Sequence, residues 1–322
     1  MRLVVTDCDH DAFAEEQAVA EAYGAELLFA DATDADELVE AGLGADGLIV
    51  QYAHITGDVL DRLPTVRAIG RYGVGYDSVD VPAATARGVA VFNVPDYGTE
   101  SVSDHAIALS LALLREIPML DRRSRSGGAS FTMARPLRLF AGRTFGVVGC
   151  GLIGTATARK ASALGFDVVV NDILADPPEP FHGYRAASFA DVLSASDVVS
   201  LNTPLTADTH HLIGADSLAL MKPGAILVNT SRGPVVDAEA LADALAAGRL
   251  RGAALDVTEP EPIPSGHRLT RLDNVVLTPH IAWYSEESYG ELKRRTVFNV
   301  ASYLAGEEPS NLVNAEVLPR AR

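Results

Sequence analysis

Residues 144–154 read Thr-Phe-Gly-Val-Val-Gly-Cys-Gly-Leu-Ile-Gly, and they decide the fold of the chain around them. An alanine-rich run follows from Thr155 to Leu164. A second apolar run then extends from Phe166 to Val170 and ends in Asn171-Asp172. This order of segments predicts a strand, a tight turn, a helix and a second strand. Such a unit is typical of an α/β sheet whose strands run parallel.

The glycines of this turn have separate physical roles. Gly149 lets the chain turn sharply off the first strand, Gly151 leaves room for a pyrophosphate, and Gly154 lets the helix pack closely on the strand. The helix N-terminus offers unpaired N–H groups and a partial positive charge to phosphates. The stretch therefore predicts a dinucleotide-binding turn; the alternative is a glycine turn that serves packing alone.

An acidic residue completes the pattern. Asp172 stands at the end of the second predicted strand, where its carboxylate can accept hydrogen bonds from both ribose hydroxyls of an adenosine. Neither residue 173 nor residue 174 is Arg or Lys, so a 2′-phosphate would meet unbalanced negative charge. The sequence therefore predicts NAD rather than NADP as the cofactor.

Composition narrows the class of protein. The 322 residues suffice for about two domains of ~150 residues each. A hydrophobic content of 48% with 21% charged residues is ordinary for a globular α/β protein. The formal net charge of −17 argues against nucleic-acid binding, which needs a basic face. An anionic substrate must then be held by a few local arginines.

The cysteines and the N-terminus bear on location. Cys8 and Cys150 are too few for a disulfide framework. Asp7, Asp9 and Asp11 interrupt the apolar start, so no secretory signal is expected. No apolar run approaches the ~20 residues that span a membrane. These features predict a cytoplasmic protein without a membrane partner.

Residues 1–98 alternate short apolar runs with helix-like stretches, which predicts a parallel sheet with right-handed crossovers. The predicted strands are residues 3–6, 26–29, 47–50, 68–71 and 89–93. The predicted helices are residues 12–23, 35–41, 57–63 and 80–87. This segment is expected to form a first α/β domain.

The chain changes character after a break at residues 97–100. Residues 101–115 are apolar on most faces, which predicts a buried helix. Residues 121–143 are rich in Arg, Ser and Gly and are expected to form an extended excursion. The alternation then resumes with strands at 197–201, 226–229, 252–255 and 275–277, and with helices at 188–195, 214–221 and 238–247. A last amphipathic helix, residues 286–304, is expected to return to the first domain.

Three predicted strands of the second half end in residues able to do chemistry. Arg232 follows the first of them, Glu259 and Glu261 follow the second, and His280 follows the third. Ligands of an open α/β sheet bind outside the carboxyl ends of its strands. All three ends are therefore expected to face the cofactor. Alone, an Arg or a His after a strand is usually a surface or structural group, but their coincidence behind the dinucleotide turn favours a site.

This set of residue types suits the reduction of a 2-oxo acid. The planar guanidinium of Arg232 can bind the carboxylate and polarise the carbonyl. His280 can give a proton to the carbonyl oxygen after hydride transfer, and a neighbouring carboxylate can orient the ring. Chemistry alone does not choose between Glu259 and Glu261 for that carboxylate.

Several further motifs share one resemblance. They are Tyr-Gly-Val-Gly-Tyr-Asp at 72–77 and the segments 101–114, 203–206, 229–233, 256–262 and 279–280. Over almost its full length the chain resembles the D-isomer-specific 2-hydroxyacid dehydrogenases. The resemblance implies Arg232, Glu261 and His280 as catalytic residues, which favours Glu261 over Glu259.

The resemblance also implies an architecture of two Rossmann-like α/β domains with the cleft between them. A parallel-sheet NAD-binding domain would comprise residues 99–286. A smaller, discontinuous, flavodoxin-like substrate domain would comprise residues 1–98 and 287–322. A homodimer would form through the NAD-binding domain with segments such as residues 118–142.

The family's binding residues carry over by position. Backbone N–H groups of Gly73, Val74 and Gly75 would hold the carboxylate of a small 2-oxo or 2-hydroxy acid. The implied cofactor contacts are Val102, Gly149, Gly151, Leu152, Ile153, Gly154, Asp172, Thr203, Pro204, Thr209, Thr230, Ser231, Arg232, Asp256 and His280.

Residues 280–286 are similar to the C-terminal-binding proteins, the corepressor branch of this family. Arg71 and Trp283 match residues of that branch's substrate pocket, which implies an apolar or thioether substrate tail; ordinary packing is the alternative role for Trp283. A rival function is 3-phosphoglycerate dehydrogenase, which would need cations beyond Arg67 and Arg71. A second rival is an NAD(H)-sensing interaction protein, which would not need a proton donor such as His280.

The histidines and cysteines predict no metal site. No cluster has the spacing of zinc ligands, and the adjacent His210 and His211 match no metal motif.

Overall fold

The computed structural model describes all residues except 33, 129, 132–135, 178 and 319–322. The chain divides into two units. Unit 1 comprises Met1–Gly98 and Ser285–Arg322, and unit 2 comprises Thr99–Tyr284. Unit 1 is therefore built from two separate segments, whereas unit 2 is one continuous stretch.

Unit 1 is built on a five-stranded parallel sheet in the order β2-β1-β3-β4-β5. Its strands are β1 (Arg2–Val5), β2 (Glu26–Phe29), β3 (Gly47–Val50), β4 (Ala68–Arg71) and β5 (Ala90–Phe92). Its helices are α1 (Ala14–Ala22), α2 (Ala35–Gly42), α3 (Gly57–Arg62), α4 (Val81–Ala86) and α11 (Glu286–Leu304). This strand order is flavodoxin-like.

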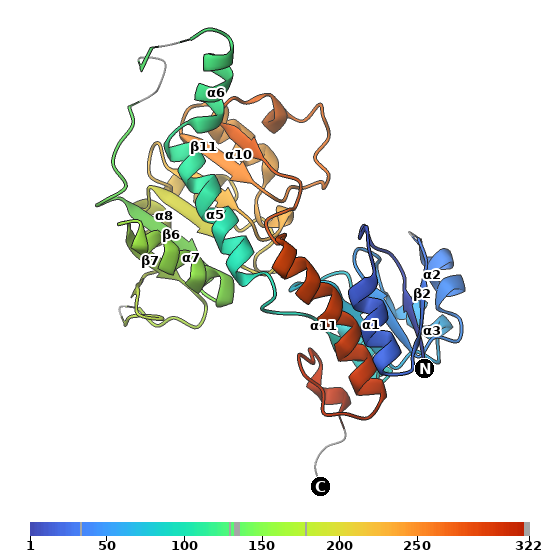
Figure 1. Cartoon of the computed structure of the whole chain (residues 1–322). Coiled ribbons are helices and arrows are strands. Elements are labelled where there is room, and N and C mark those ends of the chain that lie inside the picture. Colours follow the sequence, from blue (N-terminus) through green and yellow to red (C-terminus); the bar gives the residue numbers. More distant parts are fainter. Residues whose placement is uncertain (33, 129, 132–135, 178, 319–322) are drawn as a thin grey trace. The chain divides into compact units, whose positions relative to one another are not determined.

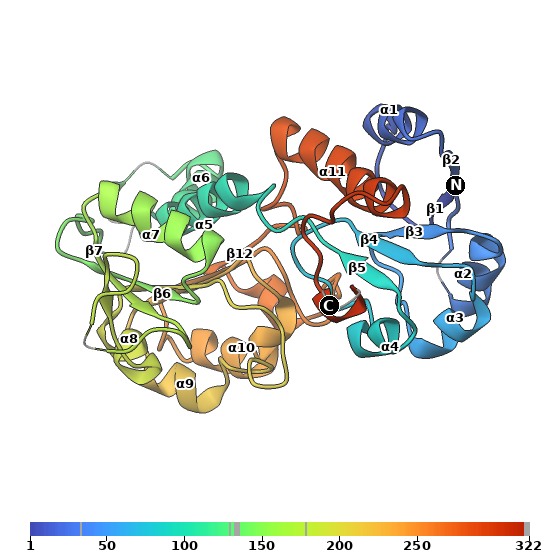
Figure 2. The same ribbon diagram turned by 90° about the horizontal axis from the view of Figure 1, so that it is seen from below.

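Helices cover both faces of the unit 1 sheet. α1 and α11 lie on one face, and α2, α3 and α4 lie on the other (Figure 2). α11 packs on β3 and β4 at two positions, Gly47 and Gly70, where the strands carry no side chain. A Cβ added to Gly47 or Gly70 would stand 2.6 Å or 2.8 Å from Val300 of α11. The two glycines therefore permit the close approach of this helix.

Unit 2 is built on a seven-stranded parallel sheet in the order β12-β11-β10-β9-β6-β7-β8. Its strands are β6 (Thr144–Val148), β7 (Asp167–Asn171), β8 (Arg185–Ala186), β9 (Val198–Leu201), β10 (Ile226–Asn229), β11 (Gly252–Leu255) and β12 (Val275–Leu277). Its helices are α5 (Thr99–Leu114), α6 (Ile117–Arg125), α7 (Leu152–Ala163), α8 (Phe189–Ala195), α9 (Ala215–Leu220) and α10 (Ala238–Ala246). The direction of winding reverses between β6 and β9, as in a Rossmann sheet. The predicted fold class is confirmed.

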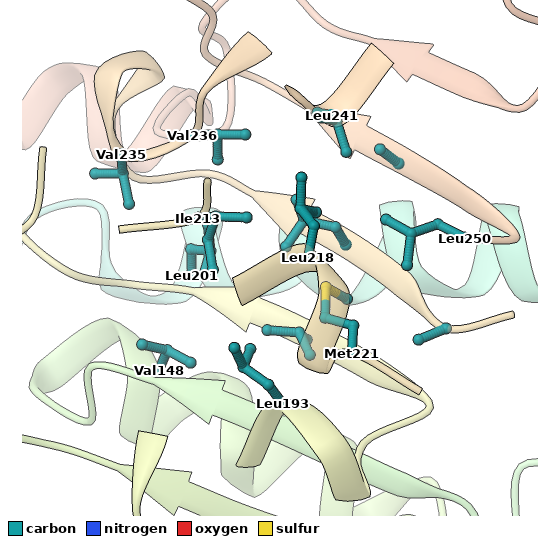
Figure 3. Close-up of a cluster of buried hydrophobic side chains, with 14 of the residues drawn as sticks. Val148, Leu193, Leu201, Ile213, Leu218, Met221, Val235, Val236, Leu241 and Leu250 are labelled. Atoms are coloured by element: carbon teal, nitrogen blue, oxygen red, sulfur yellow. The ribbon is translucent and has the colours of Figure 1, made fainter. Parts of the chain in front are cut away.

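The core of unit 2 lies in two layers. α5 and α7 cover one face of the sheet, and α8, α9 and α10 cover the other (Figure 2). Figure 3 shows the second layer, in which Leu201 of β9, Leu218 of α9 and Leu241 of α10 belong to one buried cluster. These three side chains are at most 2% exposed. Burying such apolar surface stabilises a fold by about 25 cal/mol per Å².

One predicted segment differs in the structure. The expected extended excursion over residues 121–143 is wrong for its first part, because α6 continues to Arg125. Pro118 lies in the first turn of this helix, and Asp121 forms a 2.8 Å ion pair with Arg125 one turn later. The helix carries no buried residue, so apolar periodicity could not predict it. The implied dimer segment 118–142 lies partly outside the described residues.

None of the helices in the described ranges is both long and apolar enough to cross a lipid bilayer.

Candidate active site

The glycine turn of residues 149–154 joins β6 to α7. Gly149 adopts φ +82°, and its N–H donates to the Asn171 carbonyl at 2.8 Å. A Cβ added to Gly154 would overlap the Gly149 carbonyl oxygen. The first turn of α7 therefore packs against the strand exit at a distance that only glycine permits.

The turn leaves open space at the N-terminus of α7. Gly151 caps the helix without a side-chain hydrogen bond, and a Cβ added there would meet no described atom within 4 Å. Leu152 beside it is 58% exposed. The helix N-terminus is thus accessible to an anionic group such as a pyrophosphate.

Three buried polar atoms near this turn find no hydrogen-bond partner among the described residues. They are Asn202 Oδ1 and Thr203 Oγ1, which follow β9, and Thr230 Oγ1, which follows β10. Buried polar atoms are nearly always hydrogen-bonded in folded proteins. These atoms and the open helix N-terminus fit a bound dinucleotide at the carboxyl edge of the sheet.

Asp172 follows β7 at the same edge. Its Oδ2 accepts the Cys150 N–H at 2.7 Å, and its Oδ1 accepts the Leu174 N–H at 3.0 Å. Each oxygen retains a second lone pair for a ribose hydroxyl. The next two residues, Ile173 and Leu174, are apolar, so no cation follows the carboxylate directly in sequence. Their side chains are 99% and 78% exposed. Burial raises the pKa of the Cys150 thiol, which keeps this buried side chain uncharged at the turn.

His280 and Glu261 form a close pair on neighbouring strand exits. His280 follows β12 and Glu261 follows β11. His280 Nδ1 lies 2.5 Å from Glu261 Oε1, and the side chains are 35% and 39% exposed. An imidazole whose ring N–H donates a hydrogen bond to a carboxylate is held in one orientation, and its other nitrogen is left for a ligand.

A buried carboxylate holds the turn that carries His280. Asp256 is 2% exposed, and its oxygens accept the N–H groups of Ile281 at 3.0 Å and Ala282 at 2.9 Å. The Thr278 hydroxyl donates to Asp256 Oδ1 at 2.6 Å, and the His280 N–H donates to the Asp256 carbonyl at 2.8 Å. His280 adopts φ +54°, a conformation uncommon outside glycine, and these bonds maintain it.

Arg232 lies in the loop after β10. The Asn229 side chain secures this loop, because Nδ2 donates to the Arg232 carbonyl at 2.8 Å and Oδ1 accepts the Ser231 N–H at 3.0 Å. A Cβ added to Gly233 would overlap the carbonyl oxygen of Thr258. The Arg232 loop therefore packs closely on the turn that bears Glu261.

Glu259 and Glu261 point to different histidines. Glu259 Oε2 lies 2.7 Å from His211 Nε2, whereas Glu261 contacts His280. The turn conformation, rather than the residue type, separates the two carboxylates. His210 also stands near Glu259, at 3.9 Å. Sequence spacing gave no signal for this cluster, because 48 positions separate His211 from Glu259.

The glycine loop of unit 1 follows β4. Gly73 adopts φ +136°, and the Arg71 guanidinium occupies the space that a Cβ of Gly73 would need. Tyr72 is buried, and its hydroxyl donates to Glu16 at 3.1 Å. His10 also contacts Glu16, at 3.3 Å. Sequence reasoning gave no role to His10 or Glu16. Their contacts hold Tyr72 in place, and Tyr72 lies between Arg71 and Gly73, two residues implied in substrate binding.

The other implied contacts differ in exposure. Val102 is 7% exposed on α5, and Trp283 is half-buried with its ring 5.7 Å from that of Tyr284. Thr209 lies in a turn where its hydroxyl donates to the Pro204 carbonyl at 2.6 Å. The remaining implied residues Ile153 and Ser231 are half-buried.

Taken by itself, unit 2 has the fold and site of a dinucleotide-dependent α/β enzyme. Residues 107–282 match the family model described as D-isomer specific 2-hydroxyacid dehydrogenase, NAD binding domain. The chain therefore belongs to the D-isomer specific 2-hydroxyacid dehydrogenases. It is an NAD-dependent oxidoreductase.

Individual relatives agree with this assignment. A glyoxylate reductase of Korarchaeum cryptofilum is 42% identical over 82% of this chain and 81% of its own length. A D-3-phosphoglycerate dehydrogenase of Methanocaldococcus jannaschii is 34% identical over 100% of this chain, which spans 61% of that protein. A crystal structure of D-lactate dehydrogenase from Aquifex aeolicus, complexed with NAD and lactic acid, matches with a TM-score of 0.85. It is 28% identical and covers 98% of this chain and 99% of its own.

Gly151→Ala tests the site of the pyrophosphate. We expect the variant to fold with only a small drop in melting temperature, since the added Cβ meets no described atom within 4 Å and Ala is a somewhat poorer helix cap than Gly. We expect its Kd for NADH to rise about 10-fold or more, because the methyl group displaces a charge-assisted contact at the helix N-terminus. Titration of the fluorescence of Trp283, the one tryptophan of the chain, measures binding. Gly266→Ala is the matched control, because its Cβ also meets nothing nearby.

Asp172→Ala tests the ribose contact. Loss of a hydrogen bond to a charged group costs about 1.5–3 kcal/mol, so we expect the Kd for NADH to rise at least about 10-fold. NADPH binding should change less, because the substitution also removes repulsion of the 2′-phosphate. Asp176→Ala, an exposed acid four positions on, should bind both cofactors as the wild type does. Equal losses for NADH and NADPH would contradict the assignment.

Proposed function

We propose that the protein reduces a small 2-oxo acid to the D-2-hydroxy acid, with His280 as the proton donor. The observation that carries this proposal is the 2.5 Å contact between His280 and Glu261 on adjacent strand exits of the NAD-binding unit. Bound NADH supplies the hydride to the carbonyl carbon. Glu261 accepts a hydrogen bond from the Nδ1–H of His280 and orients the ring, so Nε2 is the nitrogen that would deliver a proton to the carbonyl oxygen.

We further propose that Arg232 binds the substrate carboxylate and polarises the adjacent carbonyl. A guanidinium can form two parallel charge-assisted hydrogen bonds with a carboxylate. The bonds from Asn229 and the close packing of Gly233 support this role, because they hold the Arg232 backbone in one position. A cation that is already in position stabilises the transition state more than one that must be ordered first.

In unit 1, the backbone N–H groups of Gly73, Val74 and Gly75 would bind the carboxylate of the substrate, as the family resemblance implies. The Arg71 guanidinium supports this proposal, because it places a cation next to Gly73. With Trp283 as an apolar wall, as the likeness to the corepressor branch suggests, the favoured substrates would carry an apolar or thioether tail.

A substrate panel tests the proposal. We would follow NADH oxidation with glyoxylate, pyruvate, 4-methyl and 4-methylthio 2-oxo acids, and 3-phosphohydroxypyruvate. We expect turnover to favour the apolar chains, and Trp283→Ala to abolish that preference while retaining turnover of glyoxylate. If none of these acids is reduced although NADH binds, the NAD(H)-sensing interaction protein becomes the better account.

A second candidate is 3-phosphoglycerate dehydrogenase. It is favoured by the relative of that name, which is 34% identical along the whole of this chain. Arg67, one of the cations near the glycine loop in sequence, is 3.3 Å from Asp46, which offsets its charge. A kcat/KM for 3-phosphohydroxypyruvate above that for every unphosphorylated acid would establish this alternative.

A further inference from the structure

We propose that His210, His211 and Glu259 form a binding site for a divalent transition-metal ion such as Zn²⁺. Their candidate ligand atoms all lie within 4.8 Å of one another. Glu259 Oε2 is 2.7 Å from His211 Nε2, and Glu259 Oε1 is 3.9 Å from His210 Nε2. The site is distinct from the His280–Glu261 pair and does not depend on the proposed function.

Each of the two imidazoles has its Nε2 atom directed toward the carboxylate of Glu259. Their rings stack with centroids 4.0 Å apart and planes inclined by 28°. Zinc bonds of about 2.0–2.2 Å in tetrahedral geometry place neighbouring ligand atoms roughly 3.3 Å apart. The distances of 2.7 Å and 3.9 Å bracket that spacing. An ion would fit once rotation of the two side chains turns their in-plane Nε2 lone pairs toward one point.

The backbone holds these ligands in place. His211 adopts φ +51°, which is uncommon for a residue other than glycine. Its N–H donates to the Pro234 carbonyl at 2.8 Å, and the His210 N–H donates to the Thr206 carbonyl at 3.0 Å. An exposed ion pair contributes little to stability. The His211–Glu259 pair is therefore not expected to stabilise the chain much, whereas the same geometry holds an imidazole and a carboxylate ready to bind an ion.

The donor set indicates which ions would bind. Two imidazoles and one carboxylate form a zinc ligand set that leaves a further position for water. Imidazole nitrogen also suits Cu²⁺ and Ni²⁺. Ca²⁺ and Mg²⁺ require more oxygen ligands than this cluster provides. The three side chains are between 37% and 52% exposed, so an ion can enter from solvent.

Calorimetric titration of ZnCl₂ into the full chain tests the inference. We expect the wild type to bind one ion per chain at this site, and His211→Asn and Glu259→Gln each to weaken Zn²⁺ binding at least about 10-fold, since loss of even an outer partner has that effect. Asn tolerates a positive φ, so the first variant retains the backbone conformation. His182→Asn is the matched control, because His182 is an exposed histidine of the same unit with φ +50° and Asn again tolerates that conformation.

Thermal unfolding supplies a second measurement. Zn²⁺ should raise the melting temperature of the wild type and of His182→Asn, and it should do so much less in the two ligand variants. MgCl₂ should shift none of them. Absence of Zn²⁺ binding by the wild type, or equal binding by the wild type and both ligand variants, would overturn the inference.

Discussion

Replacement of His280 by Ala is expected to lower kcat for 2-oxo acid reduction by about 10²–10⁴-fold, the usual contribution of a positioned general acid. The substitution removes the proton donor and leaves the glycine turn and Asp172 intact. The Kd for NADH should therefore stay within a few-fold of the wild-type value. Stopped-flow measurement of NADH oxidation in a single turnover separates the chemical step from product release.

Glu261→Gln provides a graded companion to that variant. The amide can still contact the ring, but it carries no charge, so we expect a smaller loss of kcat than in His280→Ala. His267→Ala is the matched control, because His267 pairs with Glu239 at 3.2 Å in the same unit, away from the strand exits. Wild-type kcat in Glu261→Gln would reject the proposed pair, whatever the control variant shows.

Replacement of Arg232 by Lys is expected to lower kcat/KM by about 10²–10⁴-fold, because two charge-assisted hydrogen bonds at about 1.5–3 kcal/mol each depend on the planar guanidinium. The positive charge is retained, so a loss of this size would reflect geometry rather than net charge. We would measure kcat/KM at saturating NADH for the best substrate of the panel. NADH binding, followed by Trp283 fluorescence, should change little.

Arg268→Lys is the matched control for Arg232→Lys. Arg268 is an exposed arginine of the same unit that pairs with Glu239 and Asp243. Its replacement should leave kcat/KM within about 2-fold, since exposed ion pairs are worth only about 0–1 kcal/mol. If Arg232→Lys behaves in the same way, the substrate carboxylate is bound elsewhere.

The strands other than β8 were predictable because each is a short apolar run between turn-forming residues, whereas β8 consists of Arg185 and Ala186 alone and was missed. The runs at 47–50 and 226–229, for example, coincide with β3 and β10. Helix α6 was not predictable, because a solvated helix with no buried residue has no apolar periodicity. We expected residues 121–143 to be extended because they are rich in Arg, Ser and Gly, and this was wrong for the part that α6 covers.

The sequence predicted which strand ends carry the site residues, but it did not predict which of their side chains contact one another. Position after a strand predicted that Arg232 and His280 lie at one edge of the sheet. Which histidine each of Glu259 and Glu261 contacts depends on the path of a single turn. The contact of Tyr72 with Glu16 likewise depends on how α1 packs against the sheet. Sequence spacing carries little information on contacts of that kind.

The position of α11 has a consequence for synthesis on the ribosome. The strands of unit 1 leave the ribosome early, but the helix that packs against Gly47 and Gly70 is encoded some two hundred residues later. Unit 2 is continuous and can fold as soon as it has emerged, because domains generally fold as units during translation. Until α11 arrives, α1 is the only helix on that face of the first sheet (Figure 2), and the apolar surface of β3 and β4 remains exposed to water. We therefore expect unit 1 to be the part of the nascent chain that gains most from a chaperone.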